Sequence, residues 1–159
     1  MRHLASVAAI LIGSLVFAGT AAAANHQTVT ETQHMHGSWV ETGDTNPCTG
    51  DDITVNAMGN GVNHVTYFVE NGQPTEFWGT FTEAISFTFT DQGVTYSGHA
   101  TVWGNFNQNE RNQNTTFTFS IHGTGSDGST VSGHETMHFG VNANGQVTAS
   151  FDKMNFTCG

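Results

Sequence analysis

The chain has 159 residues, with 13 acidic and three strongly basic side chains and a formal charge of −10 when histidines are neutral. So few lysines and arginines exclude nucleic-acid binding, because neutralising phosphates requires clustered positive charge. The same shortage argues against an anionic membrane surface as a partner. The length fits one domain with a single core.

An apolar run over residues 4–18 follows the positive charge of Arg2 and ends in small residues. This pattern predicts a signal peptide over residues 1–24 and a secreted, extracellular domain over residues 25–159. The run is too short for a comfortable membrane span and no second one follows, so we expect no membrane insertion.

From residue 27 onward, apolar residues recur at every second position, which predicts an all-β fold. Between Phe77 and Phe89, for example, apolar residues alternate with polar ones. Turn-forming pairs such as Asn60-Gly61 and Asn144-Gly145 separate the alternating runs. We expect about eight strands, over residues 27–42, 52–58, 62–70, 75–90, 94–106, 115–123, 129–141 and 146–157.

Two departures from this pattern predict local irregularities. The polar stretch 105–114 predicts a loop at one rim. Along the last expected strand, the apolar positions change parity near Asp152-Lys153, which predicts a β-bulge there.

Cys48 and Cys158 are the two cysteines of the chain. In an exported protein they predict one disulfide, with free thiols or an intermolecular bridge as the alternative. Closing a loop of about 110 residues stabilises a fold by up to about 4.7 kcal/mol. Because the hairpins lie between the cysteines, we expect an antiparallel meander curled into a closed or nearly closed β-barrel, with a two-sheet β-sandwich as the alternative.

The residues from His134 to His138 match the HExxH signature of zinc proteases. That chemistry requires a helix, on which both histidines reach one metal ion. The flanking alternation predicts a strand, on which the histidines stand about 13 Å apart at roughly 3.3 Å per residue. The sequence therefore predicts no zinc site here.

Glu83 and Glu135 fall on the apolar parity of their strands, which predicts two inward carboxylates. They sit at an edge or rim, or are hydrogen-bonded inside to a partner such as a tyrosine or threonine, or act as acids of raised pKa in a barrel cavity.

The opposite, threonine-rich parity carries aromatic and imidazole side chains that are candidates for ligand contact. Two of its imidazoles, on neighbouring strands, could hold a metal ion or respond to pH. The candidates on this face are Trp78, Trp103, His99 and His122.

The Asn46-Pro47-Cys48-Thr49-Gly50-Asp51 segment, the stretch 141–147 and the closing Cys158 together resemble small secreted β-rich proteins of actinomycete type. This resemblance implies export, a disulfide and a β-fold, and it supplies no catalytic residues. A looser likeness to the allene-oxide-cyclase and dirigent barrels is one of architecture, which does not carry function.

The first functional hypothesis is a secreted, non-enzymatic binding or surface protein whose partner is a small apolar molecule, a glycan or another protein. One alternative is a cyclase or isomerase that uses a buried carboxylate as proton donor. The other is a metal- or pH-responsive extracellular protein. The sequence shows no catalytic constellation, cofactor motif or metal motif in a fitting structural context.

Overall fold

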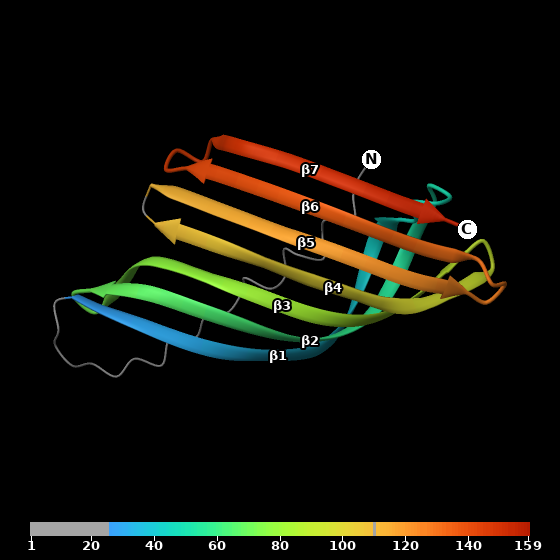
Figure 1. The fold of residues 1–159 in the computed structure, drawn as a ribbon, viewed down its shortest axis with the longest axis horizontal. Coiled ribbons are helices and arrows are strands. Elements are labelled where there is room, and N and C mark those ends of the chain that lie inside the picture. The colour runs from blue at the N-terminus through green and yellow to red at the C-terminus, as the bar shows by residue number, and fades with distance from the viewer. Residues whose placement is uncertain (1–25, 110) are drawn as a thin grey trace.

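The computed structural model describes residues 26–109 and 111–159. They form one antiparallel sheet in which each strand pairs with its neighbours in sequence (Figure 1). The strands are β1 (His26–Thr45), β2 (Asp52–Glu70), β3 (Gln73–Asp91), β4 (Val94–Asn109), β5 (Asn112–Gly125), β6 (Thr130–Asn142) and β7 (Val147–Cys158). The predicted signal peptide lies outside the described residues, among which no helix is long and apolar enough to cross a bilayer.

The all-β meander is confirmed, but the expected eight strands are seven. Residues 52–58 and 62–70 belong to one strand, β2, because Asn60-Gly61 does not turn the chain. Asn60 lies opposite His36 of β1, and its Oδ1 is 2.7 Å from His36 Nδ1. Asn60 and Gly61 also pair with Ala84 and Glu83 of β3, so ladders on both sides hold the extended conformation where the sequence alone indicated a hairpin turn.

The structure also differs from the sequence prediction at the expected rim loop and at the expected β-bulge. β4 continues to Asn109 and β5 begins at Asn112, so most of the predicted loop is strand. The register between β6 and β7 shifts next to Gly140, near the start of β7, and runs unbroken through Asp152 and Lys153. Asp152 consequently lies opposite Met137 and shares its face of the sheet.

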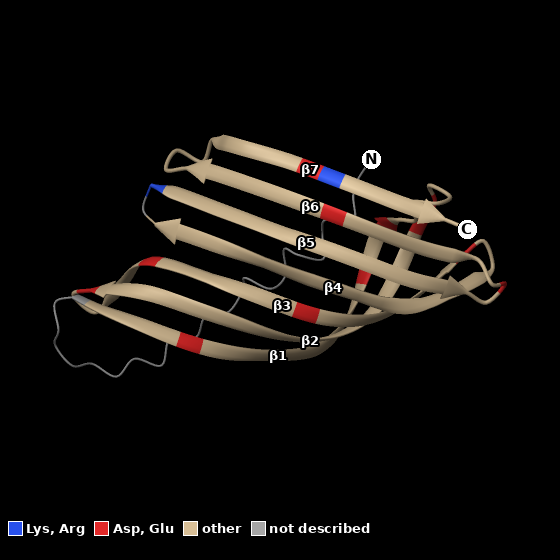
Figure 2. Cartoon of the chain, viewed as in Figure 1, with Lys and Arg blue, Asp and Glu red and all other residues tan. Residues whose placement is uncertain are grey.

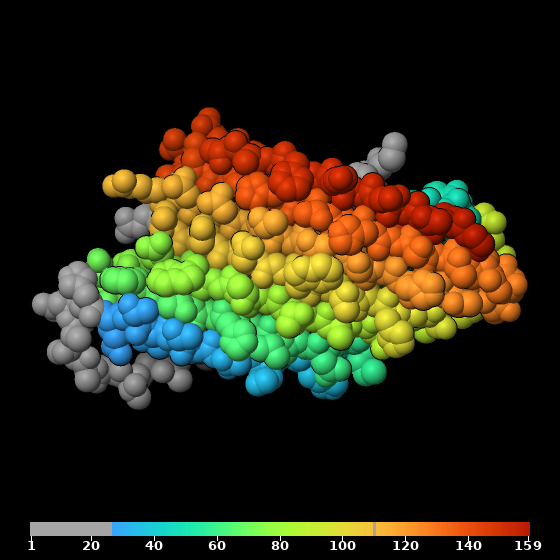
Figure 3. Space-filling model, in the orientation of Figure 1, coloured from blue at the N-terminus to red at the C-terminus, as the bar shows by residue number. Residues whose placement is uncertain are grey.

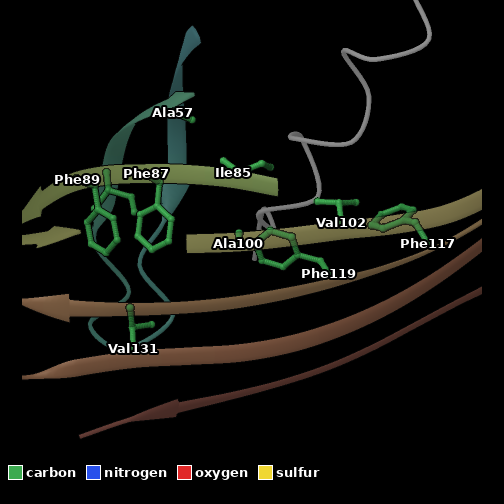
Figure 4. Close-up of a cluster of buried hydrophobic side chains, with 10 residues drawn as sticks. Ala57, Ile85, Phe87, Phe89, Ala100, Val102, Phe117, Phe119 and Val131 are labelled. Carbon is green, nitrogen blue, oxygen red and sulfur yellow. The ribbon is translucent and has the colours of Figure 1, made fainter. Parts of the chain in front are cut away.

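The sheet curls but does not close into a barrel, since β1 and β7 are its two edges and do not pair. The curl brings β2 residues into contact with strands that are not its neighbours in the sheet (Figure 1). Ile53 and Ala57 of β2 share one buried cluster with Phe119 of β5 and Val131 of β6 (Figure 4). The core therefore lies on the concave side, between the β1–β2 end and the middle strands.

The connection between β1 and β2 holds the curl in place. A disulfide joins Cys48 in this connection to Cys158 at the end of β7, with a Cα–Cα distance of 5.8 Å. The same connection is bound to the end of β3, because Asp91 accepts hydrogen bonds from Asn46 Nδ2 at 2.5 Å and Thr49 Oγ1 at 2.7 Å. We call residues 46–51 with these attachments the clasp. It bridges the two ends of the sheet that no ladder joins.

Replacing both cysteines by serine is expected to lower the free energy of unfolding by several kcal/mol, up to about 4.7, because the unfolded chain regains the entropy of a long loop. Urea unfolding followed by tryptophan fluorescence measures the change. Reducing the native protein with dithiothreitol serves as the matched control and is expected to give the same loss. Equal stability of the oxidised and reduced proteins would contradict the role of the clasp.

Candidate functional site

The sheet separates the six predicted site residues into two groups. We call the face that carries the core the inner face and the opposite one the outer face. Glu83 and Glu135 lie on the inner face, where both are buried. The other four lie on the outer face and are exposed: Trp78, Trp103, His99 and His122.

The two inner carboxylates belong to one row of residues across the sheet. Glu83 of β3 pairs with Val102, Val102 with Phe119, and Phe119 with Glu135 of β6. Glu83 is 4% exposed and Glu135 is 1% exposed, so neither occupies a rim position. Their side chains start three strands apart, with two apolar residues between them, and therefore do not form a carboxylate pair with each other.

Glu135 instead meets Asp152, which the register places on the same face of β7. Burial raises the pKa of Glu135 to about 7, and the charge and hydrogen bond of Asp152 add to the shift. Within the described residues, Oε1 of Glu135 has no hydrogen-bond partner. Protonation of Glu135 avoids a buried negative charge next to the carboxyl of Asp152.

Glu83 occupies space that a glycine leaves open. A Cβ added at Gly59 would collide with the Glu83 carboxylate and would lie 3.0 Å from the Trp39 ring. The carboxyl thus packs against β2 backbone close to an indole, and burial raises the pKa of Glu83. A larger residue at position 59 would displace it.

A small apolar cavity of about 50 Å³ lies inside the curl. Its lining includes Trp39, Ile53 and Phe119, together with the carboxylate of Asp44. Burial and the charge of Glu41 raise the pKa of Asp44 to about 6. A water molecule takes up about 30 Å³ in the liquid, so this space suits one or two waters. Ligand pockets usually measure about 300 to 1,000 Å³.

The buried carboxyls make the fold more stable in mild acid. Because the folded pKa of Glu135 is raised from 4.5 to about 7, the folded protein binds the proton more tightly than the unfolded chain. This stabilisation is complete below the unfolded pKa and is lost as pH rises through the folded one. We expect Glu135 to contribute a decrease on the order of 3 kcal/mol between pH 4.5 and 7.5.

Urea unfolding at several pH values tests this expectation, and Glu135→Gln should make the dependence on pH shallower. Glu76→Gln is the matched control, because Glu76 is an exposed carboxylate on the outer face. If the Glu135→Gln and native proteins lose stability equally as pH rises, the buried carboxyl of Glu135 does not titrate as described.

The outer face carries an open groove of about 650 Å³ over β2, β3 and β4. Two rows of directly opposed residues form most of its floor. In one row, Thr66, Trp78 and Asn107 lie side by side, and in the next, His64, Thr80 and Asn105 do so. Phe68 and Glu76 complete the outer-face lining at the next register position. Trp78 is 39% exposed, so a large part of its indole is available to a ligand.

Trp103 lies on the outer face but does not line the groove. It is 44% exposed, and its ring centre is 6.4 Å from that of His134. Figure 3 shows this continuous outer face, on which all the strands lie side by side. Trp78 and Trp103 therefore share a face without sharing a pocket.

The imidazoles of His99 and His122 start from directly opposed positions on β4 and β5, as expected for a hairpin pair. Ser86 Oγ lies 3.3 Å from His99 Nδ1. Among residues 26–109 and 111–159, no group of three or more histidine, cysteine, aspartate or glutamate side chains is placed to hold a metal ion. The HExxH letters lie in strand β6, with Glu135 on the inner face and both histidines directed outward.

Sequence patterns missed several functional candidates. Because the sequence pattern predicted a bulge at Asp152-Lys153, alternation could not assign Asp152 to a face of the sheet. Its interaction with the buried Glu135 is nevertheless the main feature of the inner face. Asp44 and Asp91 lie next to turns, where acids are usually solvated. The groove residues of β2 and β4 required the register between strands, which alternation along one strand does not supply.

Comparisons with protein-family models, with curated proteins and with solved structures gave no match for this chain. The resemblance to small secreted actinomycete proteins therefore stays a prediction.

Proposed function

We propose that this protein is a secreted glycan-binding protein that holds a carbohydrate in the outer groove of β2, β3 and β4. The main support for this proposal is the groove, because its volume of about 650 Å³ is within the usual range of ligand sites. Its aromatic and polar side chains stand on neighbouring strands of one rigid sheet.

The chemistry of the groove suits a sugar ring. A pyranose presents a face of C–H groups, which packs on an indole, and a rim of hydroxyls, which both donate and accept hydrogen bonds. Trp78 supplies the apolar surface. The amides of Asn105 and Asn107 supply donors and acceptors, and Glu76 supplies an acceptor.

The inner face gives less support to a ligand or a reaction. Its cavity of about 50 Å³ is smaller than a sugar ring or a terpenoid, and although Asp44 lines it, the predicted acids Glu83 and Glu135 do not. A cyclase or isomerase needs its acid within hydrogen-bond reach of the substrate. The observations therefore favour the binding hypothesis over the enzymatic alternative.

Trp78→Ala is expected to weaken binding at least about tenfold, as loss of an aromatic contact at the centre of a site usually does. Isothermal titration calorimetry with cellohexaose, xylohexaose and chitohexaose at neutral pH measures the affinities. Asn107→Ala is expected to give a smaller loss, because it removes hydrogen bonds at one side of the ring.

Trp103→Ala is the matched control, since Trp103 is an equally exposed tryptophan of the same face outside the groove. It is expected to bind like the native protein. Equal losses in the Trp78 and Trp103 variants would move the site away from the groove, and no binding to any of the oligosaccharides would contradict a neutral-glycan site.

A further inference from the structure

The histidines whose side chains the structure describes all lie on the outer face. They are distributed over five strands, on both sides of the groove: His34, His36, His64, His99, His122, His134 and His138. One of them, His64, lines the groove itself. Histidines scattered at random over a two-faced sheet would occupy both faces, so their segregation calls for a reason.

Five of these imidazoles have the same bonding arrangement. In each, Nδ1 lies within hydrogen-bond distance of a hydroxyl or amide oxygen on the residue directly opposite in the next strand. The pairs are Thr32–His64 at 2.9 Å, His36–Asn60 at 2.7 Å, Ser86–His99 at 3.3 Å, Thr116–His138 at 2.7 Å and Ser120–His134 at 3.0 Å. With Nδ1 engaged within the sheet, Nε2 is the ring nitrogen left to contact a partner.

Acidic side chains are mostly absent from the central part of this face. Those within the strands are largely on the inner face, as Glu83 and Glu135 are, or close to strand ends. Strand β7 contains one lysine, Lys153, directly after Asp152, and Figure 2 shows them as a blue segment next to a red one. The charged groups that share the outer face with the histidines are Asp52, Glu70, Glu76 and Lys153.

Histidine side chains in general gain a positive charge below about pH 6.5. Apart from Lys153, these histidines are the basic side chains of the outer face, so any positive charge that this face gains in mild acid belongs to them, although the whole chain is acidic. We infer that the outer face is a docking surface for an anionic polysaccharide, with the histidine array providing attraction to its carboxylate or sulfate groups in mild acid.

This inference rests on the proposed glycan site and specifies the class of glycan. Charge complementarity and extent favour a polymer as the occupant. The histidines span β1 to β6, so a small anion would contact one or two imidazoles, whereas an extended chain can contact several. The groove would hold a sugar unit of the same chain, next to His64.

Binding of dextran sulfate, polygalacturonate and unmodified dextran at pH 5.0 and 7.5 tests the inference, with biolayer interferometry as the readout. We expect both anionic polymers to bind at least about tenfold more tightly at pH 5.0, and 0.5 M salt to remove most of the gain. Unmodified dextran is expected to show no comparable gain. Equal affinity of the anionic polymers at the two pH values would overturn the inference.

A triple variant, His99→Asn/His122→Asn/His134→Asn, separates the array from the rest of the molecule. These residues lie outside the groove, and an asparagine amide can occupy the place of Nδ1 opposite Ser86 and Ser120. The buried acids are unchanged, so their titration affects the native and variant proteins alike. We expect the gain at pH 5.0 to fall at least threefold; an undiminished gain would contradict the histidine array.

Two further measurements separate this inference from the proposed function. Trp78→Ala should weaken binding of neutral oligosaccharides, as stated above, and still retain the pH-dependent gain for dextran sulfate. If neutral oligosaccharides fail to bind while the gain persists, the groove proposal fails and the array stands. Binding at pH 5.0 to phosphatidylglycerol vesicles in preference to both anionic polysaccharides would identify a membrane partner and overturn the inference.

Discussion

The covalent link between Cys48 and Cys158 is the constraint on which the rest of the structure depends. A seven-stranded meander with two free edges can flatten, and a flat sheet would expose its phenylalanines to water on one side. The clasp prevents this by holding the β1–β2 connection against the ends of both β3 and β7. The same closure removes Glu83, Glu135 and Asp44 from water and so raises their pKa values.

The two faces of the sheet consequently have different physical roles. The inner face contains apolar packing and the buried carboxyls of Asp44, Glu83 and Glu135, whose pKa values burial raises. The outer face contains short hydroxyl side chains between exposed aromatic and imidazole rings, and the Nδ1 atoms of five imidazoles are held by a neighbour across the strands. Rigid placement of this kind lowers the entropy that binding must overcome. A single sheet thus provides both the core that stabilises the protein and the surface proposed to bind a ligand.

Period-two alternation correctly predicted the fold class, the inward carboxylates and the outward rings, because the pleat of a strand alone decides these. It failed at Asn60-Gly61, where pairing with β1 on one side and β3 on the other overrides a strong local turn signal. It failed again at Asp152, whose face depends on a bulge several residues away. Barrel closure was expected from the disulfide, but two cysteines can join the ends of a sheet without pairing its edge strands. The groove arises from three strands in register and has no signature within any one of them.

The meander order described above has a consequence for how the molecule assembles. Every ladder joins strands that follow one another along the chain, and the connections between them are short. Closing short loops costs little entropy, so the sheet can grow by adding one hairpin at a time. The clasp is different, since its cysteines are separated by 110 positions and closing so long a loop costs more entropy than closing a hairpin. Oxidation of that pair is therefore favoured after the intervening strands have formed, because the folded sheet already holds the two cysteines close together.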